Sequence, residues 1–245
     1  MKHSAALLAA LLGCGAYLLF GGSAAGAPAG GPVYGEWRIR VKPDRGPDYA
    51  KLIEEKGLPL FQEAGGRMVG WWTTLIGDLY EHVTIWEYDG MPAFEKAVGF
   101  LGKDERFAKF VSLRDPLLSG EESRFLKLLP GGRKPSLPAS AAMVIHEVHR
   151  VPFEKRKAYA EAAEAALGVF EKHGIRVAGP WRTEIGRGDE VTWLWLYDSL
   201  EEREAKLEAL GGSSDMETAD ALARFASDVT KRLLLPAAFA RPAPR

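Results

Sequence analysis

The chain has 245 residues, with 32 Lys plus Arg against 33 Asp plus Glu, 47% apolar residues and one Cys. This composition excludes an intrinsically disordered chain and a membrane protein with several spans, and the near-zero net charge gives no general attraction for nucleic acid. A single Cys also excludes an internal disulfide and the zinc sites that need two or more cysteines.

The first part of the chain reads as a targeting segment. The stretch from Ala5 to Phe20 is nearly all apolar, and small residues follow from Gly21 to Ala27. This layout is typical of a secretory leader, so we assign residues 1–32 to a signal peptide or N-terminal anchor and expect an exported protein, periplasmic or secreted. Two alternatives stay open: an uncleaved membrane tether, and a lipoprotein cleaved before Cys14.

The remainder of the sequence aligns with itself when Phe61 is placed on Phe170. Residues 61–95 and 170–204 share 13 identities in 35 positions, among them Arg67 with Arg176 and Trp72 with Trp181. A repeat unit of this size indicates a duplicated domain. We therefore expect one domain at 33–130, a linker rich in Pro and Gly at 131–140, and a second domain at 141–240.

In the first copy, apolar residues alternate in a strand over 36–41, and helical spacing follows from Pro47, with a bend at Pro59 and an expected end at Gly65 and Gly66. The remaining elements follow in order: strands over 67–75 and 80–88, a helical stretch over 91–113 broken at Gly102, and a strand over 123–129. The second copy has the same order, with its strand pair over 176–184 and 190–197, a capping-box pattern at Ser199 and Glu202, a further helix over 215–229 and a last strand over 231–239. The order β-α-β-β-α-β is that of the ferredoxin-like unit, so the fold class is α+β.

The third strands are aromatic on one side. The residues sharing that side are His82, Thr84, Trp86 and Tyr88 in the first copy and Val191, Trp193, Trp195 and Tyr197 in the second. Such faces are too apolar to be left in water. We therefore predict that the two copies put these faces together in one chain, with the helices outside.

These residues resemble a known family. The run from Gly65 to Gly77 and the run from Val83 to Asp89 look like the NIPSNAP domain, and the second copy matches through Gly174, Trp181 and the run from Trp195 to Asp198. The resemblance implies a dimeric α+β barrel, formed here within one chain, and a family without a settled reaction.

The sequence departs from the family pattern on the inner face. Similar domains carry Glu-x-Arg-x-Tyr on the first strand, where we place Gly35, Trp37 and Ile39 in one copy and Val144, His146 and Val148 in the other. They also carry a His on the third strand, where Thr84 and Trp193 stand. Fewer titratable groups there make acid-base catalysis less expected and a binding cavity more expected.

Several charged and polar residues have structural interpretations. His146 and His149 are three apart on a strand, so they point to opposite faces and cannot share a metal ion. We expect Arg67 and Arg176 to pair with Glu81 and Glu190 across the hairpins, or else to recognise an anion at the barrel mouth. His173 is expected to cap a helix C-terminus, and Asp89 and Asp198 to cap helix N-termini.

The sequence lacks the motifs of serine hydrolases, nucleoside triphosphatases and classical dehydrogenases. We expect a non-catalytic protein, without metal or cofactor, that binds a small apolar or aromatic ligand or a protein partner at the barrel. An alternative is a cofactor-independent or haem-type barrel monooxygenase or isomerase using His82 or His146, and a third is an interaction module with a filled core. The candidate ligand-binding residues are Trp37, Arg67, Trp72, His82, Trp86, Tyr88, His146, Arg176, Trp181, Trp193, Trp195 and Tyr197.

Overall fold

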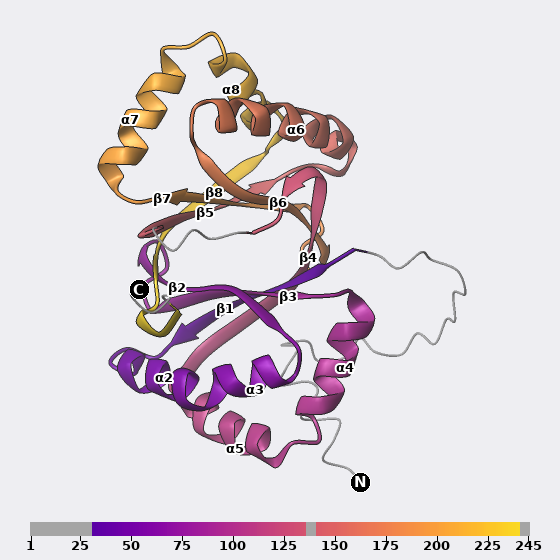
Figure 1. The fold of residues 1–245 in the computed structure, drawn as a ribbon, viewed down its shortest axis with the longest axis vertical. Helices are drawn as coiled ribbons and strands as arrows, with labels where there is room; N and C mark the ends of the chain where they lie inside the picture. Colours follow the sequence, from indigo (N-terminus) through magenta and orange to yellow (C-terminus); the bar gives the residue numbers. More distant parts are fainter. Residues whose placement is uncertain (1–30, 136–140, 241–245) are drawn as a thin grey trace, which may run out of the picture. The chain divides into compact units, whose positions relative to one another are not determined.

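The computed structural model describes residues 31–135 and 141–240, so residues 1–30 of the expected leader lie outside the described residues (Figure 1). Strands and helices follow the predicted order β-α-β-β-α-β twice, and the hydrogen-bonded strand order β1-β3-β2-β8-β5-β7-β6-β4 closes into a barrel. The α+β barrel predicted from the sequence is therefore confirmed. Within the described part, no helix is long and apolar enough to cross a membrane.

Two compact units can be separated within the described residues. Unit 1 contains the chain up to Met68 together with Tyr80–Ser123, and unit 2 contains Val69–Leu79 together with the chain from Arg124 onward.

Unit 1 consists of two paired strands and a layer of helices. Its elements are β1 (Val33–Val41), α2 (Gly46–Leu52), a π-helical turn η1 (Ile53–Gly57), α3 (Leu58–Glu63), β3 (Glu81–Tyr88), α4 (Met91–Leu101), α5 (Glu105–Arg114) and the short η2 (Asp115–Leu117). The strand β2 (Arg67–Ile76) begins here, and β4 (Leu118–Arg133) starts here and continues into unit 2.

Unit 2 contains β5 (Met143–Arg150), η3 (Phe153–Lys155), α6 (Arg156–Lys172), β6 (Arg176–Ile185), β7 (Glu190–Tyr197), α7 (Leu200–Gly211), α8 (Met216–Phe225), β8 (Asp228–Pro236) and η4 (Ala238–Ala240). Residues Gly131–Arg133 were expected in the linker, but they form the end of β4, where Arg133 pairs with Gly179 of β6. The rest of that linker includes 136–140, which lie outside the described residues.

The helices of unit 1 end where the sequence predicts. The first helical stretch changes to π-helical hydrogen bonding just before Pro59, which lacks a backbone N–H and stands in the first turn of α3. It stops at Gly65, whose φ of 92° suits a residue without a side chain. The break at Gly102 separates α4 from α5, and Asp104 caps α5 by accepting a hydrogen bond from the backbone N–H of Arg106 at 2.8 Å.

The aromatic side of β3 faces the helices of its own unit, which corrects the predicted arrangement. Ring centroids lie 5.4 Å apart between Trp86 and Phe61 of α3, and 5.2 Å apart between Tyr88 and Phe94 of α4. The prediction that this side meets the other copy is therefore wrong, because these aromatics form the core under the helical layer.

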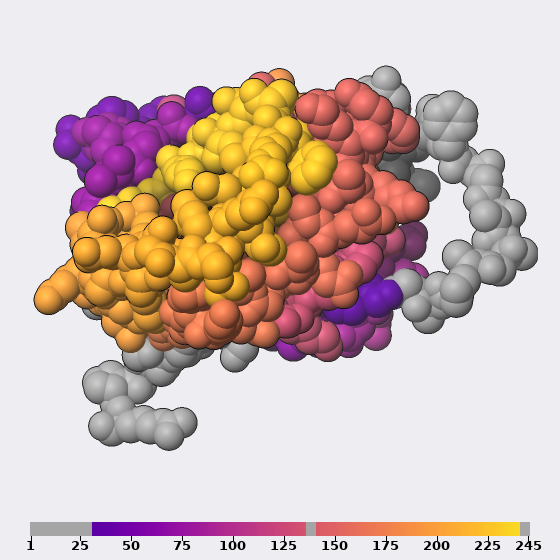
Figure 2. All heavy atoms as spheres, turned by 90° about the horizontal axis from the view of Figure 1, so that it is seen from above, coloured from indigo at the N-terminus to yellow at the C-terminus, as the bar shows by residue number. Residues whose placement is uncertain are grey.

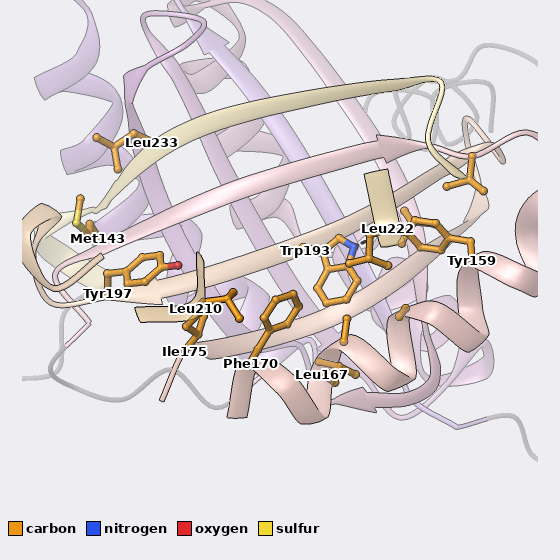
Figure 3. Close-up of a cluster of buried hydrophobic side chains, with 14 residues drawn as sticks. Met143, Tyr159, Leu167, Phe170, Ile175, Trp193, Tyr197, Leu210, Leu222 and Leu233 are labelled. Atoms are coloured by element: carbon orange, nitrogen blue, oxygen red, sulfur yellow. Dashed lines mark hydrogen bonds between the residues drawn. The ribbon is translucent and has the colours of Figure 1, made fainter. Parts of the chain in front are cut away.

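The same correction holds in unit 2. Trp193 and Tyr197 of β7 belong to a buried apolar cluster with Phe170 of α6, Leu210 of α7 and Leu222 of α8 (Figure 3). The Phe170 ring lies edge-on to Trp195 at 4.7 Å, and Trp193 and Trp195 stack at 5.6 Å. Figure 2 shows one face of this unit, with α7 in orange and α8 toward yellow.

The first strands of the two copies differ in register by one position. Gly35 pairs with Trp86 in unit 1, and Ile145 pairs with Trp195 in unit 2, so the counterpart of Gly35 stands one position later than the ungapped alignment places it. The counterpart of Trp37 is therefore Glu147 and not His146. The side of β5 that the helices of unit 2 cover therefore carries a carboxylate, Glu147, which the ungapped alignment did not place there.

Candidate functional site

Unit 2 contains a pocket of about 360 Å³ at the C-terminal end of α6. Its apolar lining includes Leu167 and Phe170 of α6, Ile175 of the following loop and Val177 of β6. This volume lies at the lower end of the range of small-molecule sites, roughly 300–1,000 Å³. The pocket can therefore hold a molecule of about the size of one or two aromatic rings.

Charged side chains also line the pocket. Arg133 of β4 and Arg176 of β6 are lining residues, as are Lys134 and Glu171. The Nε atom of Arg133 donates to Glu171 Oε1 at 2.5 Å, and this interaction lowers the pKa of the Glu171 carboxyl. Because Arg133 is paired with Glu171 and Arg176 with Asp198, much of this charge is compensated, and the lining favours a ligand with a polar end.

Arg67 and Arg176 pair with different carboxylates from those predicted. Arg67 donates to Glu87 at 2.7 Å and to Asp89 at 2.6 Å, while Arg176 donates to Asp198 at 2.8 Å. The physical reason is hairpin geometry, because the start of one antiparallel strand lies opposite the end of the next.

The carboxylates at the expected positions have other roles. Glu190 instead forms a buried ion pair with Arg124, and the hydrogen bond from Arg124 Nη1 to Glu190 Oε2 is short. Asp89 and Asp198 are ion-pair partners and not helix caps, since Gly90 and Ser199 occupy the N-cap positions. His173 does stand at the C-cap of α6, where its Nε2 lies 3.0 Å from Asp215.

A chain of buried hydrogen bonds runs between the sheet and α6 in unit 2. Trp193 Nε1 donates to the Tyr159 hydroxyl at 2.7 Å, and that hydroxyl lies 2.8 Å from His149 Nδ1 (Figure 3 shows the first two residues). His149 Nε2 then lies 2.5 Å from Glu147 Oε1. All four side chains are buried.

The direction of donation fixes the tautomer of His149. The indole N–H can only donate, so the Tyr159 oxygen accepts from Trp193 and its proton goes to His149 Nδ1. The imidazole proton is then assigned to Nε2, where it is donated to the Glu147 carboxylate. Every donor and acceptor in the chain has a partner in this arrangement.

Glu147 is the charged end of this chain. Burial raises the pKa of Glu147, but the hydrogen bond from His149 and the nearby charge of Lys231 lower it more, so the net shift is downward. Lys231 Nζ lies 3.1 Å from Glu147 Oε2. The carboxylate therefore stays ionised at neutral pH while being largely shielded from water.

His82 lies under the helices of unit 1. Its ring centroid is 4.9 Å from that of Tyr49 in α2, and burial lowers the pKa of His82 to about 4. The imidazole is therefore neutral at pH 7 and is a weaker base than an exposed histidine. His82 and His149 are both enclosed, and neither lines the pocket of unit 2.

The predicted ligand-binding residues do not gather around this pocket. Of the twelve, Arg176 is the one that lines it. Under the helical layers lie His82, Trp86, Tyr88, Trp193, Trp195 and Tyr197, while Trp72, His146 and Trp181 are buried on β2, β5 and β6. Trp37 is partly buried on β1, and Arg67 is in its ion pairs. Within unit 2, the register places His146 beside Leu194 and His149 beside Val191, on opposite faces as predicted.

Sequence reasoning missed Arg133, Lys134, Phe170 and Val177 as pocket residues, and it missed the chain from Glu147 to Trp193. The alternation of Glu147 and His149 on one predicted strand was a usable signal, because two polar residues on the same side of a strand are close enough to bond. In the described ranges, no group of three or more His, Cys, Asp or Glu side chains is placed to hold a metal ion.

Comparison with known proteins places the chain in a family. The NIPSNAP sequence profile matches residues 36–131 and 149–241. The chain belongs to the NIPSNAP family. It is 26% identical over 169 residues to human Protein NipSnap homolog 2, in a match that covers 67% of this NIPSNAP chain and 58% of that relative.

Solved structures share the barrel of this NIPSNAP chain. Two bacterial proteins, each named as a candidate monooxygenase, superpose with TM-scores of 0.62 over 84% of the chain. The protein from Lactobacillus acidophilus is 8% identical and covered over 94% of its length, and that from Fusobacterium nucleatum is 12% identical and covered over 92%. Identities this low establish a common fold and nothing further.

Proposed function

We propose that this chain is an exported NIPSNAP protein that binds a small apolar or aromatic molecule without transforming it. The observation that carries the proposal is the pocket of about 360 Å³ in unit 2, with its apolar walls and its charged lining residues. Pockets that bind small molecules combine such walls with a few polar groups that fix the orientation of the ligand.

The titratable groups of the two units favour binding over catalysis. A general base has to reach the proton that it removes. His149 already has a partner at each ring nitrogen, and His82 is buried against Tyr49. Neither lines the pocket, so a molecule held there would meet arginine, lysine and glutamate side chains together with apolar walls.

The test begins with the purified full chain. Native mass spectrometry and solvent extraction should reveal a copurifying small molecule, and 1-anilinonaphthalene-8-sulfonate should bind as an aromatic probe. Val177→Phe fills the pocket from β6 and should weaken binding of the probe at least tenfold. Val229→Phe makes the same change on β8, at a residue 37% exposed that does not line the pocket, and should leave binding unchanged. Equal binding by both variants, with unaltered thermal melting, would refute the proposed site.

A barrel monooxygenase is the second candidate function, because two proteins of the same fold bear that description. Such an enzyme would use molecular oxygen to convert a CH₂ group of an activated aromatic substrate to a carbonyl, with water as the other product. Incubating the extracted molecule with the chain in air would decide between the two. A product that gains an oxygen atom, and that does not form with His82→Gln, would show that the chain is an enzyme and would overturn the proposal of binding alone.

A further inference from the structure

The turn between β2 and β3 exposes three large apolar side chains. All residues from Leu75 to Tyr80 are exposed, and the exposed fractions are 51% for Leu75, 63% for Ile76 and 64% for Leu79. We call Leu75, Ile76 and Leu79 the tip patch. Tyr80, the next residue in the chain, is 52% exposed with a φ of 65°.

A β-bulge presents the first of these residues to solvent. The pairing of β2 with β8 shifts between Thr74 and Ile76, so that Leu75 is the extra residue. The hairpin of the second copy has the same irregularity, because the pairing of β6 with β4 shifts between Thr183 and Ile185. A bulge turns a side chain away from the sheet, and here it does so at corresponding positions.

The second copy shows that this turn does not need apolar residues to fold. Gly77 and Gly186 have φ values of 130° and 123°. The counterparts of Leu75, Leu79 and Tyr80 are Glu184, Gly188 and Asp189, and Ile185 alone matches in being apolar. The same backbone is thus built with polar residues in one copy, so the apolar tip patch of the other requires an explanation outside folding.

The turn that carries the tip patch has little charge of its own to offer an electrostatic partner. No Lys or Arg occurs from Leu75 to Tyr80, and the only charged residue there, Asp78, receives a hydrogen bond from Arg232 at 3.1 Å. A protruding turn with apolar side chains and a tyrosine beside them is suited to the boundary between lipid headgroups and acyl chains.

We propose that the tip patch inserts into the surface of a lipid bilayer. The apolar run from Ala5 to Phe20, expected to enter a membrane during export or as an anchor, supports this choice of partner. A retained anchor could reach the same bilayer. The strand β1 spans about 26 Å from Val33 to Val41, which lies near Tyr80, and the chain before it at residues 21–32 can extend about 40 Å, which is more than this distance. The proposal is independent of the pocket in unit 2.

The experiment uses the full chain. It measures whether the labelled turn itself enters the bilayer, because a leader alone could bring the protein to vesicles. Cys14→Ser removes the only thiol, and Ile76→Cys then carries an environment-sensitive nitrobenzoxadiazole label. Ile185→Cys is the matched control, with the same side chain at the corresponding position and 52% exposure. With phosphatidylcholine vesicles, the label at 76 should shift to the blue and be quenched by spin-labelled acyl chains, while the label at 185 should not.

Three results would overturn the proposal. The first is no shift at 76, or an equal shift at both positions. The second is a shift at 76 that needs phosphatidylserine, which would indicate surface charge. The third is a shift at 76 without vesicles that grows with protein concentration, which would indicate contact with a second copy. Replacing Leu75 by Glu and Leu79 by Gly, the residues of the second copy, should abolish the shift without lowering the melting temperature.

Discussion

On three strands, a glycine stands two positions before a tryptophan whose ring lies over it. A Cβ atom built on Gly70 would lie 2.1 Å from the ring of Trp72, and one on Gly179 would lie 2.5 Å from the ring of Trp181. Gly35 stands in the same relation to Trp37 at 2.4 Å. Each indole therefore lies over a glycine of its own strand, which explains why Gly70 and Trp72 recur together as Gly179 and Trp181.

Gly70→Ala should destabilise the chain by about 1–3 kcal/mol, because the fully buried Trp72 ring has to leave its position. Gly99→Ala is the matched control, since nothing lies within 4 Å of its Cβ position on α4. There the same substitution should stabilise by roughly 0.5–1 kcal/mol, through helix propensity. Urea unfolding followed by tryptophan fluorescence measures both, and equal effects would show that the indole does not need the glycine.

The hydrogen-bond chain of unit 2 gives a second test at this scale. Tyr159→Phe removes a partner from both Trp193 Nε1 and His149 Nδ1, and buried polar groups without partners should cost about 1–3 kcal/mol. Tyr80→Phe, at a residue that is half exposed, should change the unfolding free energy by less than about 0.5 kcal/mol. A Tyr159→Phe protein as stable as the wild type would show that the chain of bonds contributes nothing net.

Individual residue roles were less predictable than the positions of strands. The pairing of Arg67 and Arg176 follows from which ends of a hairpin lie opposite each other, and the sequence contains that information once the turn is located. The link from His149 to Tyr159 was not accessible, because it depends on how far along β5 the helix α6 passes.

Among the elements, α7 is held by a small number of buried contacts and depends on its cap. Ser199 accepts a hydrogen bond from the backbone N–H of Glu202 at 3.0 Å, and Glu202 accepts one from the backbone N–H of Asp198 at 2.5 Å. Ser199 thus caps α7 as predicted, while Glu202 reaches back to the N–H of the residue before the N-cap, in a variant of the predicted capping box. Leu210 is the residue of α7 that is fully buried.

Ser199→Ala should lower the unfolding free energy by about 1 kcal/mol, since the N–H of Glu202 loses its acceptor. Ser199→Asp keeps an acceptor at the N-cap and should stay close to the wild type. Hydrogen exchange of α7 amides would show whether the loss is local to this helix. Similar losses in both variants would assign the effect to the change of side chain and not to capping.

The elements themselves were predictable because their signals are local. Period-two alternation located β1, and Pro59, Gly65 and Gly102 located the helix ends. The ends of β4 were not predictable, since the strand extends to Arg133 through pairing with β6. Alternation also shows which side chains share a side of a strand, but not which side the helices cover, and that is why Trp86 and Trp193 were placed on the wrong face.

For the whole molecule, the sequence contained enough to predict a closed barrel. The alignment of the chain with itself gave the same order of elements twice, and the resemblance to NIPSNAP domains implied how such units close. The pocket of unit 2 was not predictable, because Arg133, Phe170 and Val177 come from three elements whose packing distances are not written in any local pattern.

The stability of the whole chain should fall in acid in two stages. The pKa of His82 is about 4 in the folded protein against 6.5 as its ordinary value, so the unfolded chain binds the extra proton between these limits. A group whose pKa is lowered in the folded state contributes to the unfolding free energy at pH values above its unfolded-state pKa. That contribution is lost as the pH falls towards the folded-state pKa. Glu147, whose pKa is also lowered, adds a further loss below its ordinary value of 4.5.

Between pH 7 and pH 5 the His82 contribution should decrease by about 2 kcal/mol, since 2.5 pKa units of separation correspond to roughly 3.4 kcal/mol in full. His82→Gln cannot take up a proton and should flatten the unfolding free energy over this range, while the fall below pH 4.5 that belongs to Glu147 remains. The measurement is a series of urea titrations from pH 7 to pH 4. If wild type and His82→Gln lose stability in parallel between pH 7 and pH 5, the imidazole is not held neutral by its burial beside Tyr49, and the acid sensitivity has to come from other groups.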